Sequence, residues 1–97
     1  MMKKHLLSFV TDEDGDQLFM HADLAGVEFF MEELNRIKEK LKANECPHSH
    51  LFTEDWGGEE LSNSKLSGQE GEVNQIHHVK IYGWNEVWCK KHKLERV

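Results

Sequence analysis

The sequence predicts an α+β domain, in which an antiparallel sheet of about four strands carries one long amphipathic helix packed on one face. Three observations predict this class. The turn signal Asp14-Gly15 separates two apolar runs, residues 24–41 carry apolar side chains at helical period, and residues 48–53 and 73–82 are strand-like.

The first two strands are expected at residues 5–10 and 17–22, which are rich in apolar side chains. Asp14 and Gly15 lie between these runs, and both residue types tolerate the positive φ angles of a type I′ turn. We therefore expect the two strands to form an antiparallel hairpin.

The acids of this turn have a second interpretation, as the start of a calcium-binding loop. Asp12, Asp14 and Asp16 have the alternating spacing of EF-hand ligands. An EF-hand loop also needs glycine at its sixth position and a bidentate glutamate at its twelfth. This chain has Gln17 and Asp23 at those positions, so a hairpin turn is the preferred interpretation.

A long helix is expected to begin after Asp23, whose carboxylate suits an N-cap position. Acidic residues occur early in this helix and lysines near its end. This order is favourable, because the helix dipole is positive at the N-terminus and negative at the C-terminus. Asn44 suits the position after a helix end, and Pro47 prevents continuation. Apolar residues spaced three and four apart form one face that is expected to be core: Leu24, Val27, Phe30, Met31, Leu34, Ile37 and Leu41.

Two later strands are expected at residues 48–53 and 73–82. Between them, residues 62–72 are mostly polar and rich in glycine, which predicts a mobile loop. A basic tail at residues 85–97 is expected to be helical at its start. The length of 97 residues fits a single domain covering residues 1–97.

The formal net charge is −6, and its distribution is uneven. Residues 12–60 contain fourteen acids and four bases. A negative body repels phosphate backbones, so a nucleic-acid ligand is not expected. It would instead attract a cationic protein and raise the rate of association. Acidity that only keeps a small protein soluble is the alternative explanation.

The sequence predicts a cytoplasmic protein. No apolar run approaches 18 residues, so neither a transmembrane helix nor a membrane partner is expected. The apolar run after the two amino-terminal lysines is too short for a signal peptide. In the cytoplasm, Cys46 and Cys89 are expected to be free thiols rather than a disulfide.

The turn within residues 48–61 is the main candidate for a binding surface. Trp56 is followed directly by Gly57 and Gly58. Glycine permits a positive φ or a close backbone approach, at an entropic cost of about 0.5–1 kcal/mol relative to alanine. The chain is therefore expected to need one particular turn here, surrounded by acids that suit a protein partner. A tight turn covered by a buried Trp56 is an alternative compatible with this one.

Seven histidines raise a metal site as an alternative. His48 and His50 are expected on one side of a strand, whereas His77 and His78 point to opposite faces of another. No zinc-finger spacing is present, so neither a metal nor another cofactor is expected. A nucleophile elbow and a phosphate-binding glycine loop are also missing, so the protein is not expected to be an enzyme.

Four segments of the chain form a specific combination. They are Asp23-Leu24-Ala25-Gly26-Val27, His48-Ser49-His50-Leu51, Trp56-Gly57-Gly58 with Glu60-Leu61, and Ile76-His77-His78-Val79-Lys80-Ile81-Tyr82-Gly83-Trp84. Together they resemble the immunity protein 32 family of bacterial polymorphic-toxin systems. The resemblance covers about residues 5–84, and the basic tail lies outside it.

The resemblance implies a small cytoplasmic α+β protein that binds and neutralises a cognate toxin and has no catalytic activity of its own. Because nuclease toxins carry basic clefts, we expect an acidic surface that occludes the active site or an adjacent exosite. A small histidine-rich metal-binding or regulatory domain is the alternative function. The residues expected to contact the toxin are Glu28, Glu32, Glu54, Asp55, Trp56, Glu59, Glu60 and Trp88.

Overall fold

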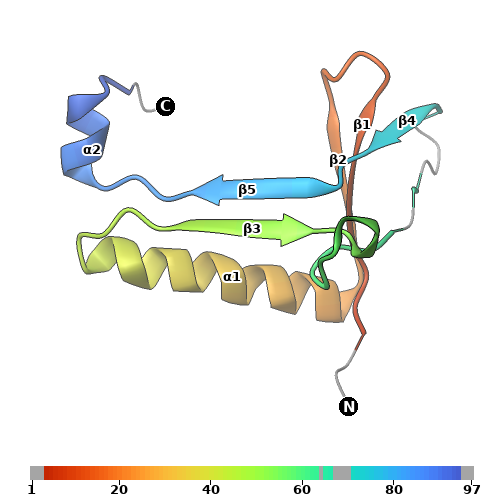
Figure 1. Cartoon of the computed structure of the whole chain (residues 1–97), viewed down its shortest axis with the longest axis horizontal. Coiled ribbons are helices and arrows are strands. Elements are labelled where there is room, and N and C mark those ends of the chain that lie inside the picture. Colours follow the sequence, from red (N-terminus) through yellow and green to blue (C-terminus); the bar gives the residue numbers. More distant parts are fainter. Residues whose placement is uncertain (1–3, 64, 67–70, 95–97) are drawn as a thin grey trace.

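The computed structural model of the chain describes residues 4–63, 65–66 and 71–94 (Figure 1). The expected loop at residues 62–72 and the basic tail therefore fall partly outside the described residues. In chain order, the elements are β1 (Leu7–Asp12), β2 (Leu18–Ala22), α1 (Leu24–Lys42), β3 (His48–Phe52), the 3-10 helix η1 (Glu54–Trp56), β4 (Val73–Gln75), β5 (His78–Tyr82) and α2 (Glu86–Lys91).

The strands pair antiparallel, but they form two sheets. One sheet has the order β2-β1-β4, and the other contains β3 and β5. The two run in different directions in Figure 1, where β1 and β2 stand upright while β3 and β5 lie across the view. The α+β class, the antiparallel pairing and the long helix are confirmed, with the strands divided between two sheets instead of joined in one.

The strand expected at residues 73–82 is divided into β4 and β5, and this division creates the second sheet. β4 pairs with β1, whereas β5 pairs with β3. The crossing lies at Ile76 and His77. The N–H of Ile76 still donates to the carbonyl of Phe9 at 2.9 Å, while the carbonyl of His77 already accepts from the N–H of Thr53 at 2.9 Å. One run of strand-like residues thus contributes a strand to each of the two sheets.

The core lies where α1 meets both sheets. Its buried members are Leu7 and Phe9 of β1, Leu51 of β3, and Leu61. The ring of Phe30 on α1 meets that of Phe9 edge to face, with 5.7 Å between the ring centroids. Figure 1 shows α1 running alongside β3, so one helix covers the small second sheet and reaches the first. A two-stranded sheet needs such support, because it is marginally stable by itself.

The apolar face expected from the sequence of α1 is only partly buried. Ile37 is buried, but Leu24, Val27, Met31 and Leu34 are exposed. The prediction that the whole face is core is therefore wrong. The helix is rotated so that the neighbouring face, which contains Gly26, Glu33 and Ile37, is its buried side.

Both ends of α1 follow local signals in the sequence. The carboxylate of Asp23 accepts hydrogen bonds from the backbone N–H of Gly26 at 2.7 Å and of Leu6 at 3.0 Å. Asp23 therefore caps the helix, as predicted, and also attaches the segment before β1 to it. At the other end, Asn44 has a φ of 63°, the left-handed conformation common after a helix end.

These hydrogen bonds make the contribution of Asp23 to stability depend on pH. The N–H groups of Leu6 and then Gly26 hold the pKa of its carboxyl group below the ordinary 3.8. The unfolded chain thus takes up this proton at a higher pH than the folded protein, so this stability is present above pH 3.8 and is lost as the pH falls below it, through the lower pKa of the folded protein. We expect Asp23→Asn to lower Tm at neutral pH, by a difference that shrinks in acid. Circular-dichroism melts across this range test it, and a difference independent of pH would contradict it.

The basic tail begins with a short helix, as predicted. Asn85 caps α2, since its side-chain oxygen accepts from the N–H of Trp88 at 2.9 Å. Its amide nitrogen donates to the carbonyl of Asn44 at 3.0 Å, which joins α2 to the end of α1. Cys89 is buried and Cys46 is exposed, and both are free thiols as predicted. Of the helices in the described part of the chain, none combines the length and apolar character needed to cross a membrane.

Candidate functional site

The turn that follows β3 is held in one shape by backbone hydrogen bonds. The carbonyl of Thr53 accepts from the N–H of Trp56 at 3.0 Å and from that of Gly58 at 2.9 Å. The carbonyl of Glu54 accepts from the N–H of Gly57 at 3.0 Å. We call residues 54–60 the acidic turn. Because its backbone is hydrogen-bonded internally, its side chains project from a fixed frame.

The two glycines of the acidic turn serve different purposes. Gly57 has a φ of 86°, the left-handed conformation that glycine adopts without strain. At Gly58 the requirement is space, since a Cβ atom there would lie 2.4 Å from the carbonyl oxygen of Phe52. The prediction that the chain needs one particular turn here is therefore confirmed.

Trp56 stands out from this turn with 60% of its surface exposed. Its ring stacks on that of His77, with 5.3 Å between centroids and 2° between planes. His77 is itself fixed, because its Nδ1 atom is hydrogen-bonded to Oγ1 of the buried Thr53 at 2.8 Å. The alternative in which Trp56 is a buried lid is therefore wrong. The ring is supported by His77 and otherwise open to solvent.

Three exposed acids lie on the same turn as Trp56, within three positions of it in the sequence, namely Glu54, Asp55 and Glu59. Asn63 braces this part of the turn. Its side-chain oxygen accepts from the N–H of Asp55 at 2.9 Å, and its amide nitrogen donates to Glu54 at 3.4 Å. The result is an exposed aromatic ring with exposed acids before and after it in the chain, all on a braced backbone.

Glu60 has a different role from the other acids of the turn. Its carboxylate accepts a hydrogen bond from the N–H of Glu59 at 2.6 Å. Its backbone carbonyl accepts from Nε2 of His5 at 2.7 Å, and the His5 ring stacks on Phe29 of α1 with 4.7 Å between centroids. Glu60 is half-buried and helps to hold the turn against the segment before β1 and against α1.

The stacking of Trp56 on His77 joins the two most specific parts of the sequence resemblance. The Trp-Gly-Gly segment and the His-His segment, about 20 residues apart in the chain, form one structural unit. No family model, no curated protein and no solved structure matches this chain. The resemblance to the immunity protein 32 family therefore stays a prediction from motifs.

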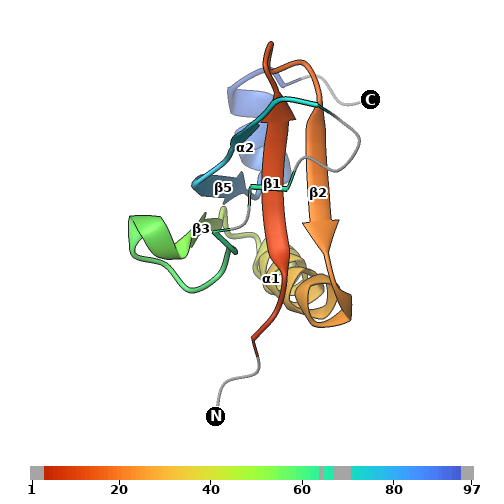
Figure 2. The same cartoon turned by 90° about the vertical axis from the view of Figure 1, so that its right-hand side faces the viewer.

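The other predicted contact residues lie elsewhere. Glu28 and Glu32 are exposed on the first half of α1, and Figure 2 shows β1 between this helix and the acidic turn. Trp88 is on α2, which lies at the far end of β3 and β5 from the acidic turn in Figure 1. The predicted residues therefore form one compact group at 54–60 and two separate groups.

The outer face of the second sheet carries histidines. Nδ1 of His50 and Nε2 of His78 are 2.9 Å apart and share a hydrogen bond, and the ring of His48 lies 5.3 Å from that of His50. Desolvation lowers the pKa of His50 below its ordinary 6.5, and the nearby Lys80 lowers it further. Within residues 4–63, 65–66 and 71–94, no three metal-binding side chains are grouped so that they could hold an ion.

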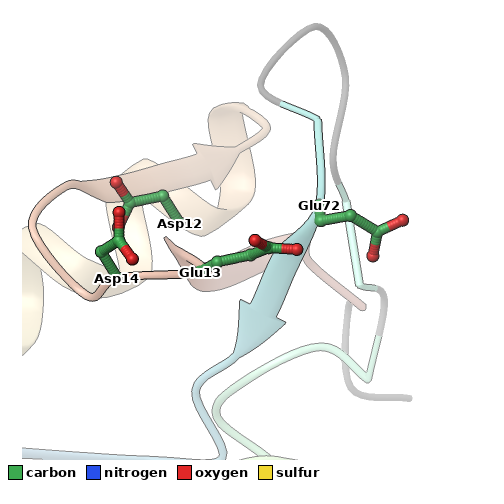
Figure 3. Close-up of a pocket in the computed structure, with 4 residues that line it drawn as sticks. All are labelled: Asp12, Glu13, Asp14 and Glu72. Atoms are coloured by element: carbon green, nitrogen blue, oxygen red, sulfur yellow. The ribbon is translucent and has the colours of Figure 1, made fainter.

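A second acidic group lies at the β1–β2 turn. Asp12, Glu13 and Asp14 are joined there by Glu72, which precedes β4 (Figure 3). Asp12 has a structural role, since its carboxylate accepts from the N–H of Asp16 at 2.8 Å. Figure 3 shows the side chain of Glu72 extending away from the other three, so the four carboxylates do not converge on one point.

Proposed function

We propose that this protein is an immunity protein that binds and neutralises a cognate bacterial toxin through its acidic turn. The observation that supports this most is the exposure of Trp56 on a braced backbone. Full burial of a large apolar side chain is worth about 1.5–3 kcal/mol, and Trp56, which is 60% exposed, forgoes part of this energy. Tryptophan is also the residue type most enriched at the centres of protein interfaces. Burial of this ring by a partner would recover that energy.

The charge around Trp56 indicates the kind of partner. Glu54, Asp55 and Glu59 form a negative rim, and a partner with a basic cleft would be attracted to it over several ångströms. A fixed turn loses little conformational entropy on binding, which favours high affinity. These features agree with what the resemblance implies, a protein inhibitor that occludes a basic active site or exosite and performs no reaction itself.

The proposed contact surface is the acidic turn, with Trp56 at its centre. Glu28 and Glu32 would contribute long-range attraction from α1 rather than direct contacts beside Trp56. Trp88 lies at the opposite end of the second sheet, so a toxin domain would need to span that sheet to reach both tryptophans.

Co-expression tests the proposed function. The probe is the carboxy-terminal domain encoded by the neighbouring reading frame, expressed with and without this protein in a bacterial host. We expect the domain to arrest growth when expressed by itself, and this protein to restore growth and co-purify with it. The proposal is wrong if the two fail to bind, or if the partner surface that binds is acidic.

A charge-reversal variant tests the acidic turn directly. Replacing Asp55→Lys and Glu59→Lys together should lower the association rate by about tenfold at low salt and flatten its salt dependence. Glu60 is left unchanged because it holds the turn. Stopped-flow or surface-binding kinetics with the toxin domain provide the measurement.

The matched control carries the same change in net charge at the β1–β2 turn, as Glu13→Lys with Asp14→Lys. We expect this control to reduce the association rate much less than the variant in the acidic turn. If both pairs slowed association equally, net charge rather than the acidic turn would be responsible.

The alternative function, a histidine-based metal-binding or regulatory domain, stays a prediction. Metal analysis of protein purified without an affinity tag distinguishes it from the immunity proposal. Stoichiometric zinc in that sample would favour the alternative.

A further inference from the structure

Helix α1 carries a second apolar stripe beside the one that packs on the sheets. Its spacing of three, four, three, four and three residues is that of the a and d positions of a coiled coil. The exposed fraction is 73% at Leu24 and 62% at Met31, and Val27 and Leu34 are exposed as well. The six positions are Leu24, Val27, Met31, Leu34, Lys38 and Leu41. We call them the α1 seam.

The seam is distinct from the face by which α1 is attached to its own sheets. That attached face includes Phe30, which contacts Phe9, and Glu33, whose carboxylate accepts from the hydroxyl of Ser49 at 3.2 Å. Helix α1 therefore has two apolar faces, and its own chain covers one of them. Figure 1 shows α1 along the lower border of the molecule, with no other element below it.

The chain as a whole exposes more surface than a compact protein of its mass. The chain exposes 7270 Å², whereas a compact monomer of 11.4 kDa exposes about 5,800 Å². Its radius of gyration is 15.3 Å, against about 12.5 Å for a compact domain of 97 residues. The excess of about 1,500 Å² is larger than the roughly 800 Å² that each partner buries in a standard interface. An interface of ordinary size would therefore restore a normal exposed area.

Charge indicates that a second copy of this chain, in antiparallel orientation, is the partner. Residues 24–32 of α1 carry two acids, Glu28 and Glu32, and no base. Residues 33–42 carry more bases than acids, with Arg36, Lys38, Lys40 and Lys42 against Glu33 and Glu39. Two such helices side by side in opposite directions place the acidic half of each beside the basic half of the other, whereas a parallel pair would place like halves together. The helix is thus complementary to itself under twofold symmetry.

The register follows from the seam. With the twofold axis between residues 32 and 33, Met31 meets Leu34 of the second copy, and Leu24 meets Leu41 of the second copy. Val27 meets the aliphatic stem of Lys38, whose ammonium group can reach water. On the flank of the seam, Glu28 faces Lys42 of the second copy. The present partner of Lys42 is Glu39 at 3.6 Å, an exposed pair that contributes little and can be exchanged.

We propose that the protein forms a twofold homodimer in which the α1 seams of two copies pack antiparallel. This inference goes beyond the immunity function and does not depend on it. The dimer leaves the acidic turn free, because Figure 2 shows β1 between this turn and α1. It engages Glu28, and therefore places this residue in the dimer rather than in the contact with toxin.

Sedimentation of the full chain tests the proposal. We expect the wild-type protein to sediment at about twice the chain mass of 11.4 kDa and to melt at a temperature that rises with protein concentration. Met31→Glu should weaken the dimer by at least about a hundredfold, because it places a carboxylate in the middle of an apolar seam. Because Met31 is exposed in the single chain, this variant should keep the circular-dichroism spectrum of the wild type.

The matched control is Val87→Glu on α2, an apolar residue with the same exposed fraction of 62%. We expect Val87→Glu to remain dimeric. A wild-type chain that is monomeric at every concentration overturns the proposal. A dimer that Val87→Glu disrupts and Met31→Glu does not would also overturn it, since the interface would then be at α2.

A charge exchange tests the antiparallel register. Glu28→Lys and Lys42→Glu should each weaken the dimer by about threefold to tenfold, because each places like charges opposite one another. The double variant should restore wild-type dimerisation. Failure of the double variant to restore it overturns the register. Binding of toxin to Met31→Glu is measured in parallel and is expected to be unchanged, so that a failure of the dimer is distinguished from a failure of the proposed function.

Discussion

Replacing Trp56 with alanine is expected to weaken binding of the toxin domain by about 30-fold or more, which corresponds to roughly 2 kcal/mol. The substitution removes the exposed ring at the centre of the acidic turn. It leaves the hydrogen bonds of Thr53 and Glu54 that define the backbone of the turn. The loss should therefore be mainly in the dissociation rate, since the surrounding carboxylates still attract the partner. Titration calorimetry and surface-binding kinetics provide the measurement.

The same variant should be almost as stable as the wild type. Trp56 is 60% exposed, and its main contact is the stacking on His77, which is worth about 0.5–1.5 kcal/mol. A buried tryptophan would cost about 3–5 kcal/mol instead. A loss of that size on thermal or urea unfolding would show that the ring is part of the core, and would remove the main support for the proposed site.

Trp88→Ala is the matched control, because it makes the same change at the opposite end of the second sheet. We expect it to leave toxin affinity within about threefold of wild type. If Trp88→Ala weakened binding as much as Trp56→Ala, the contact surface would extend along the whole sheet, and the acidic turn would not be its centre.

The parts of the fold that were predictable are those that local chemistry determines. Asp23 caps α1 with hydrogen bonds to residues within the first turn, and Asn44 ends the helix with its own backbone conformation. The hairpin at Asp14-Gly15 forms as predicted, but only Gly15 is left-handed, with a φ of 76°, so the turn is not of type I′. In each case, the residues that produce the feature lie within a few positions of it in the sequence.

The division of residues 73–82 between two sheets was not predictable in the same way. Alternating side chains indicate a strand but do not identify the strand that it pairs with. That choice is made by β1 for β4 and by β3 for β5, segments 25 or more positions away in the chain. The sequence around Ile76 and His77 contains neither glycine nor proline to mark the crossing.

The rotation of α1 shows a related limit. Leu24, Val27, Met31 and Leu34 have the same helical period as the residues that pack on the sheets. Periodicity identifies an apolar face but does not tell one wide face against the core from two adjacent faces, one of them free. The spacing of the α1 seam was visible in the sequence, and only the burial pattern shows that the chain itself does not cover it.

The part of the candidate site that comes from one continuous stretch of sequence was predictable. Glu54, Asp55, Trp56 and Glu59 are neighbours in sequence, so their proximity needed no tertiary information. The support that His77 gives to Trp56 was missed, because it depends on β5 lying beside β3. Trp88 lies on α2, at the far end of the second sheet from the turn, and shared residue type gave no information about this separation.

The largest effect on stability is expected from Gly26→Ala. Gly26 is buried in the first turn of α1, and a Cβ atom there would lie 1.8 Å from the carbonyl oxygen of Leu6 and 2.8 Å from its carbonyl carbon. Both are backbone atoms, so no side-chain rotation relieves the contact. The segment around Leu6 would have to move away from the helix. Such overpacking costs about 1–3 kcal/mol, and more where the backbone is fixed.

Movement of this segment would also disturb the acidic turn. The adjacent His5 donates to the carbonyl of Glu60 and stacks on Phe29, so it connects the segment before β1 to both the turn and the helix. We therefore expect Gly26→Ala to lower Tm by about 10 °C or more, and to weaken toxin binding without any change at a contact residue. Differential scanning calorimetry gives the first value and titration calorimetry the second.

Ala25→Gly is the control that separates the effect of helix propensity from that of the steric contact. It lies at the neighbouring position of the same helical turn and should cost at most about 1 kcal/mol, through lower helix propensity. If helix propensity alone mattered, Gly26→Ala should stabilise the helix by a similar amount. The steric contact with Leu6 predicts the opposite, a lower free energy of unfolding. A rise in Tm for Gly26→Ala would mean that the approach of Leu6 to α1 is looser than 1.8 Å implies. A fall much larger than that of Ala25→Gly would confirm that this contact fixes the segment which holds the acidic turn in place.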